Sequence, residues 1–185
     1  QSVKVLKSAL EIYIQMNDDS HIPILMMETG IAYAALGKED ETMRLLEQAF
    51  QIWKRNGNLT WQANVLNNLG VLHYLQGNYD KAILVLEEGL LCAKRSGYYV
   101  RIEALLLISL GDVYAEVEDF SLADQYYQQG YEIAEEIGDQ FLLNYLSLAR
   151  ANLFIQQLDL SQANRLLDNA SKLISSQASQ YEDGL

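Results

Sequence analysis

The chain has 185 residues, 50% of them apolar, with glycine and proline sparse between short breaks, so the composition predicts an all-helical fold with a sizeable core. No apolar run approaches the roughly 20 residues of a membrane span, and no signal-peptide pattern opens the chain. The net charge of -12 is uneven, because residues 102–185 hold 3 Lys+Arg and 14 Asp+Glu, and this acidic half argues against direct contact with nucleic-acid phosphates.

Apolar residues recur at helical spacing in nine segments, which are separated by short breaks that contain Gly, Asn or Asp. The predicted helices, in chain order, are 3–16, 22–36, 39–55, 59–76, 79–96, 98–117, 121–137, 140–157 and 161–175. Glycine or asparagine in a break such as 76–79 can take the left-handed conformation that ends a helix. Residues 177–185 are polar and are predicted to form a frayed tail.

The sequence around Gly70 returns at spacings of 40 or 41 residues, which is typical of solenoid proteins. The aligned columns are Gly30/Gly70/Gly111/Ala151, Tyr33/His73/Tyr114/Phe154, Thr42/Ala82/Ala123/Ala163, Ala49/Gly89/Gly130/Ala170 and Gly57/Gly97/Gly138. This register predicts a single solenoid over residues 3–176, made of a half repeat 3–16 and the repeats 21–56, 59–96, 98–137 and 139–175. Because residue 1 is Gln and the first helix has no partner, we expect the chain to be part of a longer protein.

Gly70 lies in the middle of a helical run, although glycine costs about 1 kcal/mol of helix propensity relative to alanine. Two antiparallel helices approach closely only where a side chain is nearly absent. We therefore expect a small residue in the first helix of each pair, helix A, to face a small residue in the second, helix B. Close packing around Gly70 and Ala82 would then offset the lost propensity.

These residues resemble the tetratricopeptide repeat. The matching positions are Leu69, Gly70, His73, Gly77, Tyr79, Ala82, Leu86 and Gly89. The usual proline at the end of helix B is missing, and each unit is about six residues longer than the family's 34-residue standard. Such long units are similar to the module of bacterial MalT-type transcription regulators. The resemblance implies a right-handed α-α superhelix and a non-catalytic module that binds a protein or peptide in a concave groove, as the signal-sensing or regulatory part of a larger regulator. A scaffold segment in an assembly and a small-molecule inducer module are the alternatives.

Residues that could carry catalysis or bind a metal are few. His73 occupies an aromatic packing column, and His21 lies in a break. Cys92 is the one cysteine, so an intrachain disulfide is excluded, a cytoplasmic location is favoured, and the thiol is expected to be a small buried side chain. Neither paired metal-ligand spacings nor a phosphate-binding loop is present in the sequence. We expect no enzymatic activity, no cofactor and no metal.

In tetratricopeptide arrays the A helices line the groove, so the resemblance also implies a set of groove residues. These are Glu28, Asn64, Asn67, Asn68, Val71, Tyr74, Ser109, Asp112, Glu116, Tyr145, Asn152 and Gln156. The asparagine amides could pair with the backbone of an extended peptide, or they could simply lie on a solvated helix face. The groove positions hold no Lys or Arg, and their carboxylates favour a neutral or basic partner over an acidic one. The uncapped ends of the solenoid also allow a homodimer.

Overall fold

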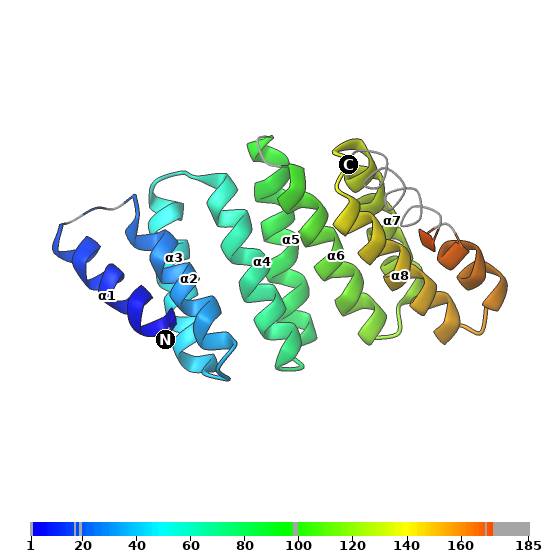
Figure 1. The fold of residues 1–185 in the computed structure, drawn as a ribbon, viewed down its shortest axis with the longest axis horizontal. Coiled ribbons are helices and arrows are strands. Elements are labelled where there is room, and N and C mark those ends of the chain that lie inside the picture. The colour runs from blue at the N-terminus through cyan, green and yellow to red at the C-terminus, as the bar shows by residue number, and fades with distance from the viewer. Residues whose placement is uncertain (1, 17, 19, 98–99, 169, 172–185) are drawn as a thin grey trace, which may run out of the picture. The chain divides into compact units, whose positions relative to one another are not determined.

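The computed structural model describes residues 2–16, 18, 20–97, 100–168 and 170–171, which form two compact units, Gln1–Ile102 and Glu103–Leu185 (Figure 1). Within the described ranges every regular element is an α-helix, and none of these helices is long and apolar enough to cross a membrane. The predicted tail, 177–185, lies outside the described residues.

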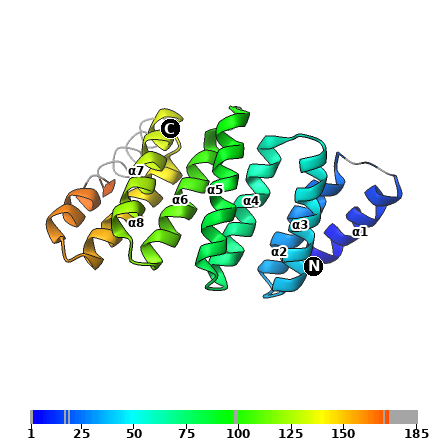
Figure 2. The same cartoon turned by 180° about the vertical axis from the view of Figure 1, so that it is seen from behind.

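The first unit is a row of helices in which each packs against the next along the chain. Figures 1 and 2 show α2 beside α3 and α4 beside α5 from opposite sides. The short turns make each of these two couples an antiparallel hairpin, and α1 is a single helix that packs on α2. The helices are α1 (Ser2–Gln15), α2 (Ile22–Ala34), α3 (Glu39–Arg55), α4 (Leu59–Leu75) and α5 (Tyr79–Ser96).

The second unit contains most of α6 (Val100–Glu116), together with α7 (Phe120–Glu136) and α8 (Gln140–Gln156). Helical residues continue at 160–168 and 170–171. The core of this unit is built from small side chains such as Ala104 and Ala123 and from large ones such as Tyr127 and Leu146. The eight predicted helices that correspond to α1–α8 agree with the observed bounds to within two residues.

From α2 onward, a residue with positive φ follows each helix, and these residues recur every 20 or 21 residues. Glycine holds five of these positions, among them the predicted column Gly57, Gly97 and Gly138, with φ of 66°, 61° and 68°. The two others are Glu118 and Leu158, both with φ of 61°. A left-handed residue after the last helical turn lets the chain reverse, and it favours glycine because no Cβ then meets the backbone.

Side-chain caps fix where several helices begin. Asn58 accepts a hydrogen bond from the backbone N–H of Trp61 at 3.2 Å, and Asp119 accepts one from that of Leu122 at 3.2 Å. These caps satisfy N–H groups that have no partner inside the helix. The start of each of these helices is therefore set by a capping residue that comes directly after a left-handed turn residue.

The small-residue column is buried, as expected, and its glycines lie against large side chains of helix B. A Cβ added to Gly70 would lie 2.4 Å from Cγ of Leu86, and one added to Gly111 would lie 2.4 Å from Cε1 of Tyr127. Gly70 and Gly111 therefore make room for a large side chain of helix B, a contact that the sequence prediction did not include. At Gly30 a small partner is present, because the Thr42 hydroxyl donates to the Gly30 carbonyl at 3.0 Å.

Candidate functional site

A pocket of about 330 Å³ lies in the second unit, between α6, α7 and α8. Its wall combines apolar side chains with a carboxylate, two phenols and two amides. The lining residues are Asp112, Ala115, Tyr127, Tyr145, Leu148, Ala149, Asn152, Leu153 and Gln156. This volume suits one side chain or a small organic group rather than a whole peptide.

Asp112 is the charged group of this pocket, and two tyrosines hold its carboxylate. The Tyr127 hydroxyl donates to Oδ1 at 2.7 Å, and the Tyr145 hydroxyl donates to Oδ2 at 3.2 Å. Burial raises the pKa of Asp112 above its ordinary value of 3.8, although both hydroxyl bonds act in the opposite direction. The pocket therefore contains a partly desolvated carboxylate whose orientation is fixed by residues of α7 and α8.

Gly111 allows Tyr127 to reach this carboxylate from α7. The Tyr127 ring occupies the space that a Cβ at position 111 would fill. In the repeat register Tyr127 takes the position that Leu46 and Leu86 hold in earlier repeats, and Asp112 takes the position of Val71. An apolar pair has thus been replaced by a hydrogen-bonded polar pair in this repeat, a change that packing alone does not require.

No cation neutralises Asp112 within the part of the second unit that the structure describes. The guanidinium of Arg150, which follows the lining residue Ala149, is paired with other groups. Its Nε lies 2.7 Å from Oδ1 of Asp124, and the guanidinium also donates to Gln128. Residues 103–185 carry 3 Lys+Arg against 14 Asp+Glu, so this part of the chain is strongly acidic. A cationic group is the ligand that this electrostatic environment favours.

The predicted groove residues of the second unit are only partly brought together. Asp112, Tyr145, Asn152 and Gln156 all line the pocket. Ser109 is buried and Glu116 is exposed, and neither lines it. Tyr127 was missed by the sequence prediction because only A helices were expected to supply groove residues. Its place in a leucine column is the signal that could have identified it.

The predicted residues of the first unit lie on α2 and α4. The side-chain amide nitrogens of Asn64 and Asn68 donate to backbone carbonyls four residues earlier, at 3.0 Å and 2.9 Å, so each amide can still offer a ligand its oxygen and its second N–H. Asn67, Val71 and Tyr74 are half-buried, and Glu28 is exposed. One groove that includes the predicted residues of both units remains a prediction.

Residues that could act in other chemistry do not gather into a site. Burial raises the pKa of the Cys92 thiol, which disfavours the reactive thiolate. Among the described residues, no three His, Cys, Asp or Glu side chains lie together as metal ligands would. The Asp112 pocket offers hydrogen bonding and charge, without an activated nucleophile beside it.

Solved structures with low sequence identity share this fold. BtubC from P. vanneervenii is 18% identical with a TM-score of 0.83, over 95% of this chain and 72% of its own. A signal transduction ATPase from Pyrococcus horikoshii, described as having a tetratricopeptide repeat sensor, is 19% identical with a TM-score of 0.80, over 97% of this chain and 27% of its own. A Rap protein complexed with competence and sporulation factor is 17% identical with a TM-score of 0.76, over 98% of this chain and 53% of its own.

The comparisons confirm the predicted fold class, an all-α tetratricopeptide-like repeat array. No curated protein matches the sequence. The family model of the MalT-like TPR region matches residues 8–183, nearly the whole sequence, and the chain therefore belongs to that family.

Proposed function

We propose that this chain is a non-catalytic module that binds a protein or peptide segment through a basic side chain, which enters the pocket between α6, α7 and α8. The observation that carries this proposal is the partly buried Asp112 carboxylate, oriented by two tyrosine hydroxyls and given no cation by the described residues. A desolvated anion without a counter-charge is costly, and a ligand cation removes that cost.

The chemistry of the pocket suits the end of a lysine or arginine side chain. Its ammonium or guanidinium would contact Asp112, and its methylene stem would pack against Leu148 and Ala149. The Tyr145 ring, which is 41% exposed, adds an aromatic surface that attracts cations. Asn152 and Gln156 supply hydrogen-bonding groups at the same pocket.

The surface beside the pocket favours a peptide or protein over a free cation. Phe141 and Leu148 are 70% and 54% exposed, and with Tyr145 they follow the i, i+4, i+7 spacing of one helix face. An exposed apolar stripe of this kind is a feature of interaction sites. Residues that flank the basic side chain of a ligand would pack along it.

The larger role that we propose is the signal-sensing part of a bacterial transcription regulator. Membership of the MalT-like TPR region family supports this role. Two structures of similar fold support it further, one named for a tetratricopeptide repeat sensor and one complexed with a competence and sporulation factor. Ligand binding near Asp112 would then change the equilibrium between states of a longer protein.

The test uses three capped pentapeptides that differ only at the central residue, acetyl-Gly-Ala-X-Ala-Gly-amide with X as lysine, norleucine or glutamate. Titration of the 15N-labelled protein, followed by NMR, should show shifts for residues 109–115 and 145–153 with the lysine peptide. Norleucine has the same stem without the charge, so it should bind about tenfold more weakly, and glutamate should not bind.

Two variants connect the binding to Asp112. Asp112→Asn should weaken lysine-peptide binding about tenfold, and Tyr145→Phe should weaken it less. Glu135→Gln is the matched control, because Glu135 is exposed on α7 and does not line the pocket. Equal binding of the lysine and glutamate peptides, or an unchanged affinity in Asp112→Asn, would overturn the proposal. A scaffold role would instead leave all three peptides without effect.

A further inference from the structure

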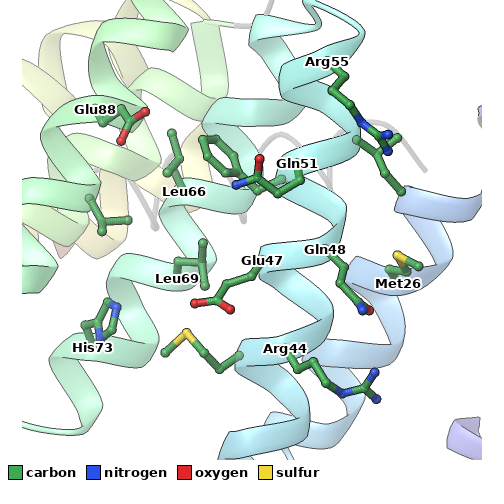
Figure 3. A pocket seen from close by; sticks show the side chains of 14 residues that line it. Met26, Arg44, Glu47, Gln48, Gln51, Arg55, Leu66, Leu69, His73 and Glu88 are labelled. Carbon is green, nitrogen blue, oxygen red and sulfur yellow. The ribbon is translucent and has the colours of Figure 1, made fainter.

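A second and larger pocket lies in the first unit, and the B helices α3 and α5, which were not assigned to the groove, contribute most of its lining residues. It measures about 770 Å³ and surrounds α3, with α4 and α5 on one side and Met26 of α2 on the other (Figure 3). Leu66, Leu69 and Val85 give it an apolar wall, and Glu47, Glu88 and His73 add polar groups. The sequence analysis does not assign these residues to any site.

The preceding repeat contains an equivalent pocket, which serves as an internal comparison. Its volume is about 330 Å³, and it lies between α1, α2 and α3. The two sets of lining residues correspond at a spacing of 40: Lys7 to Glu47, Thr29 to Leu69 and Tyr33 to His73. Compared with the smaller pocket, the larger one has the imidazole of His73 in place of a phenol ring and the apolar Leu69 in place of a threonine. It also has the carboxylate of Glu47 in place of an ammonium.

A histidine at position 73 is energetically unfavourable compared with the tyrosine or phenylalanine of the same column. Its Nδ1 is buried and has no hydrogen-bond partner among the described residues, whereas its ring also interacts with the side chain of Gln76. Burial, followed by the charge of Lys81, lowers the pKa of His73 and favours the neutral ring. Tyrosine and phenylalanine fill the same column elsewhere without an orphaned ring nitrogen. Packing therefore does not explain the histidine, whose smaller ring lines the larger of the two pockets.

The charges at this pocket are divided between the two sides of α3. Figure 3 shows Glu47 and Gln51 extending from α3 towards α4, whereas Arg44 and Arg55 extend on the side of Met26. Glu47 and His73 line the same pocket, and the charge of Glu47 acts to raise the pKa of His73 against the larger effect of burial. Glu88 adds a second carboxylate from α5. The part of the pocket next to the apolar wall therefore favours a cation.

We propose that this pocket binds a small hydrophobic amine. The apolar body of the ligand would pack against Leu66, Leu69 and Val85 beside the imidazole ring of His73, and its ammonium would pair with Glu47. The two methionines of the pocket, Met26 and Met43, give it an adaptable surface for such a body. This site lies in the first unit and does not depend on the Asp112 pocket of the second.

The test uses phenethylammonium as the probe, with phenethyl alcohol and phenylacetate as the neutral and anionic comparisons. NMR titration of the intact chain should show phenethylammonium shifting residues 43–55 and 66–73 together with the 15N resonance of His73 Nδ1. The alcohol should bind several-fold more weakly, and phenylacetate should not bind. Binding of phenylacetate as tight as that of the amine would overturn the proposal.

Three variants separate binding from folding. His73→Tyr restores the residue of the repeat column, so it should fold at least as stably as the native chain and bind at least tenfold more weakly. Glu47→Lys introduces the charge found at Lys7 and, because Glu47 is exposed, should keep the fold and abolish binding. Glu87→Gln is the control, since Glu87 is exposed next to Glu88 but does not line the pocket. Native affinity in either His73→Tyr or Glu47→Lys would refute the assignment.

Discussion

Gly70 and Gly30 occupy the same column of the repeat, yet the structure predicts opposite effects for their replacement by alanine. At Gly70 the new Cβ would lie 2.4 Å from both Cγ and Cδ2 of Leu86, well inside the ~3.5–4.0 Å of a normal carbon contact. At Gly30 the closest atom is Cγ of Leu46, at 3.4 Å. Leu86 is fully buried, with 0% exposure, and cannot turn out into solvent.

The magnitude follows from two opposing contributions. Forcing an extra carbon into a packed core costs about 1–3 kcal/mol, and two contacts at 2.4 Å place Gly70→Ala near the upper end. Replacing a helical glycine with alanine returns about 1 kcal/mol of propensity. The net change is a loss of about 2 kcal/mol for Gly70→Ala, which for a chain of this length lowers Tm by about 4–8 °C. Gly30→Ala should instead gain about 0.5–1 kcal/mol.

Urea denaturation and thermal unfolding, both followed by circular dichroism at 222 nm, measure these changes in the native and variant chains. The double variant Gly70→Ala/Leu86→Ala provides a further check, because removing the leucine side chain should eliminate most of the steric penalty of the new methyl group at position 70. The reasoning is refuted if Gly70→Ala is as stable as the native chain, or if the two glycine replacements change the stability in the same direction.

Other residues give predictions of similar kind. Glu118→Gly and Leu158→Gly should each raise the free energy of unfolding by about 1 kcal/mol, because glycine removes the strain of a side chain at positive φ, and an unchanged Tm would contradict this. Thr42→Ala should lower it by about 1 kcal/mol through loss of the hydroxyl that bonds the carbonyls of Gly30 and Lys38, and Thr42→Ser should restore most of that loss in the same denaturation assay. Burial raises the pKa of Asp112, so the folded chain holds this proton more tightly than the unfolded chain does. The contribution of Asp112 to stability therefore falls as pH rises from its ordinary value of 3.8 through the raised value, and Asp112→Asn should abolish this fall; denaturation from pH 3 to 7 that shows the same slope in both proteins would disprove it.

The fold could be predicted because the same pattern of residues recurs several times in one sequence. The columns of Gly70 and Gly97 set both the register and the turns, and each copy corroborates the others. The identity of the atoms that fill the space beside Gly70 could not be predicted in the same way. Helical periodicity gives the face on which a residue lies, but the side chain that reaches closest across the helix pair depends on its conformation, and here it is that of Leu86.

The residues of the candidate site that lie on A helices could be predicted from the sequence, whereas the residue on a B helix could not. Asp112 and Tyr145 could be assigned from the register, whereas Tyr127 reaches the carboxylate from helix B across the gap left by Gly111. The pocket beside His73 had a signal in the sequence, a histidine in an aromatic column. That signal is equally consistent with a packed core residue until the surrounding volume and the unpaired nitrogen are known.

The left-handed residues at regular intervals have a consequence for how such a chain can change its length. A stretch cut at Gly37 and Gly77 would begin and end in nearly the same backbone conformation, with φ of 69° and 71°. Tandem copying or excision of the two intervening helices, α3 and α4, would join two ends that already match. A gene encoding this array could therefore expand or contract by recombination without first having to evolve a new joint.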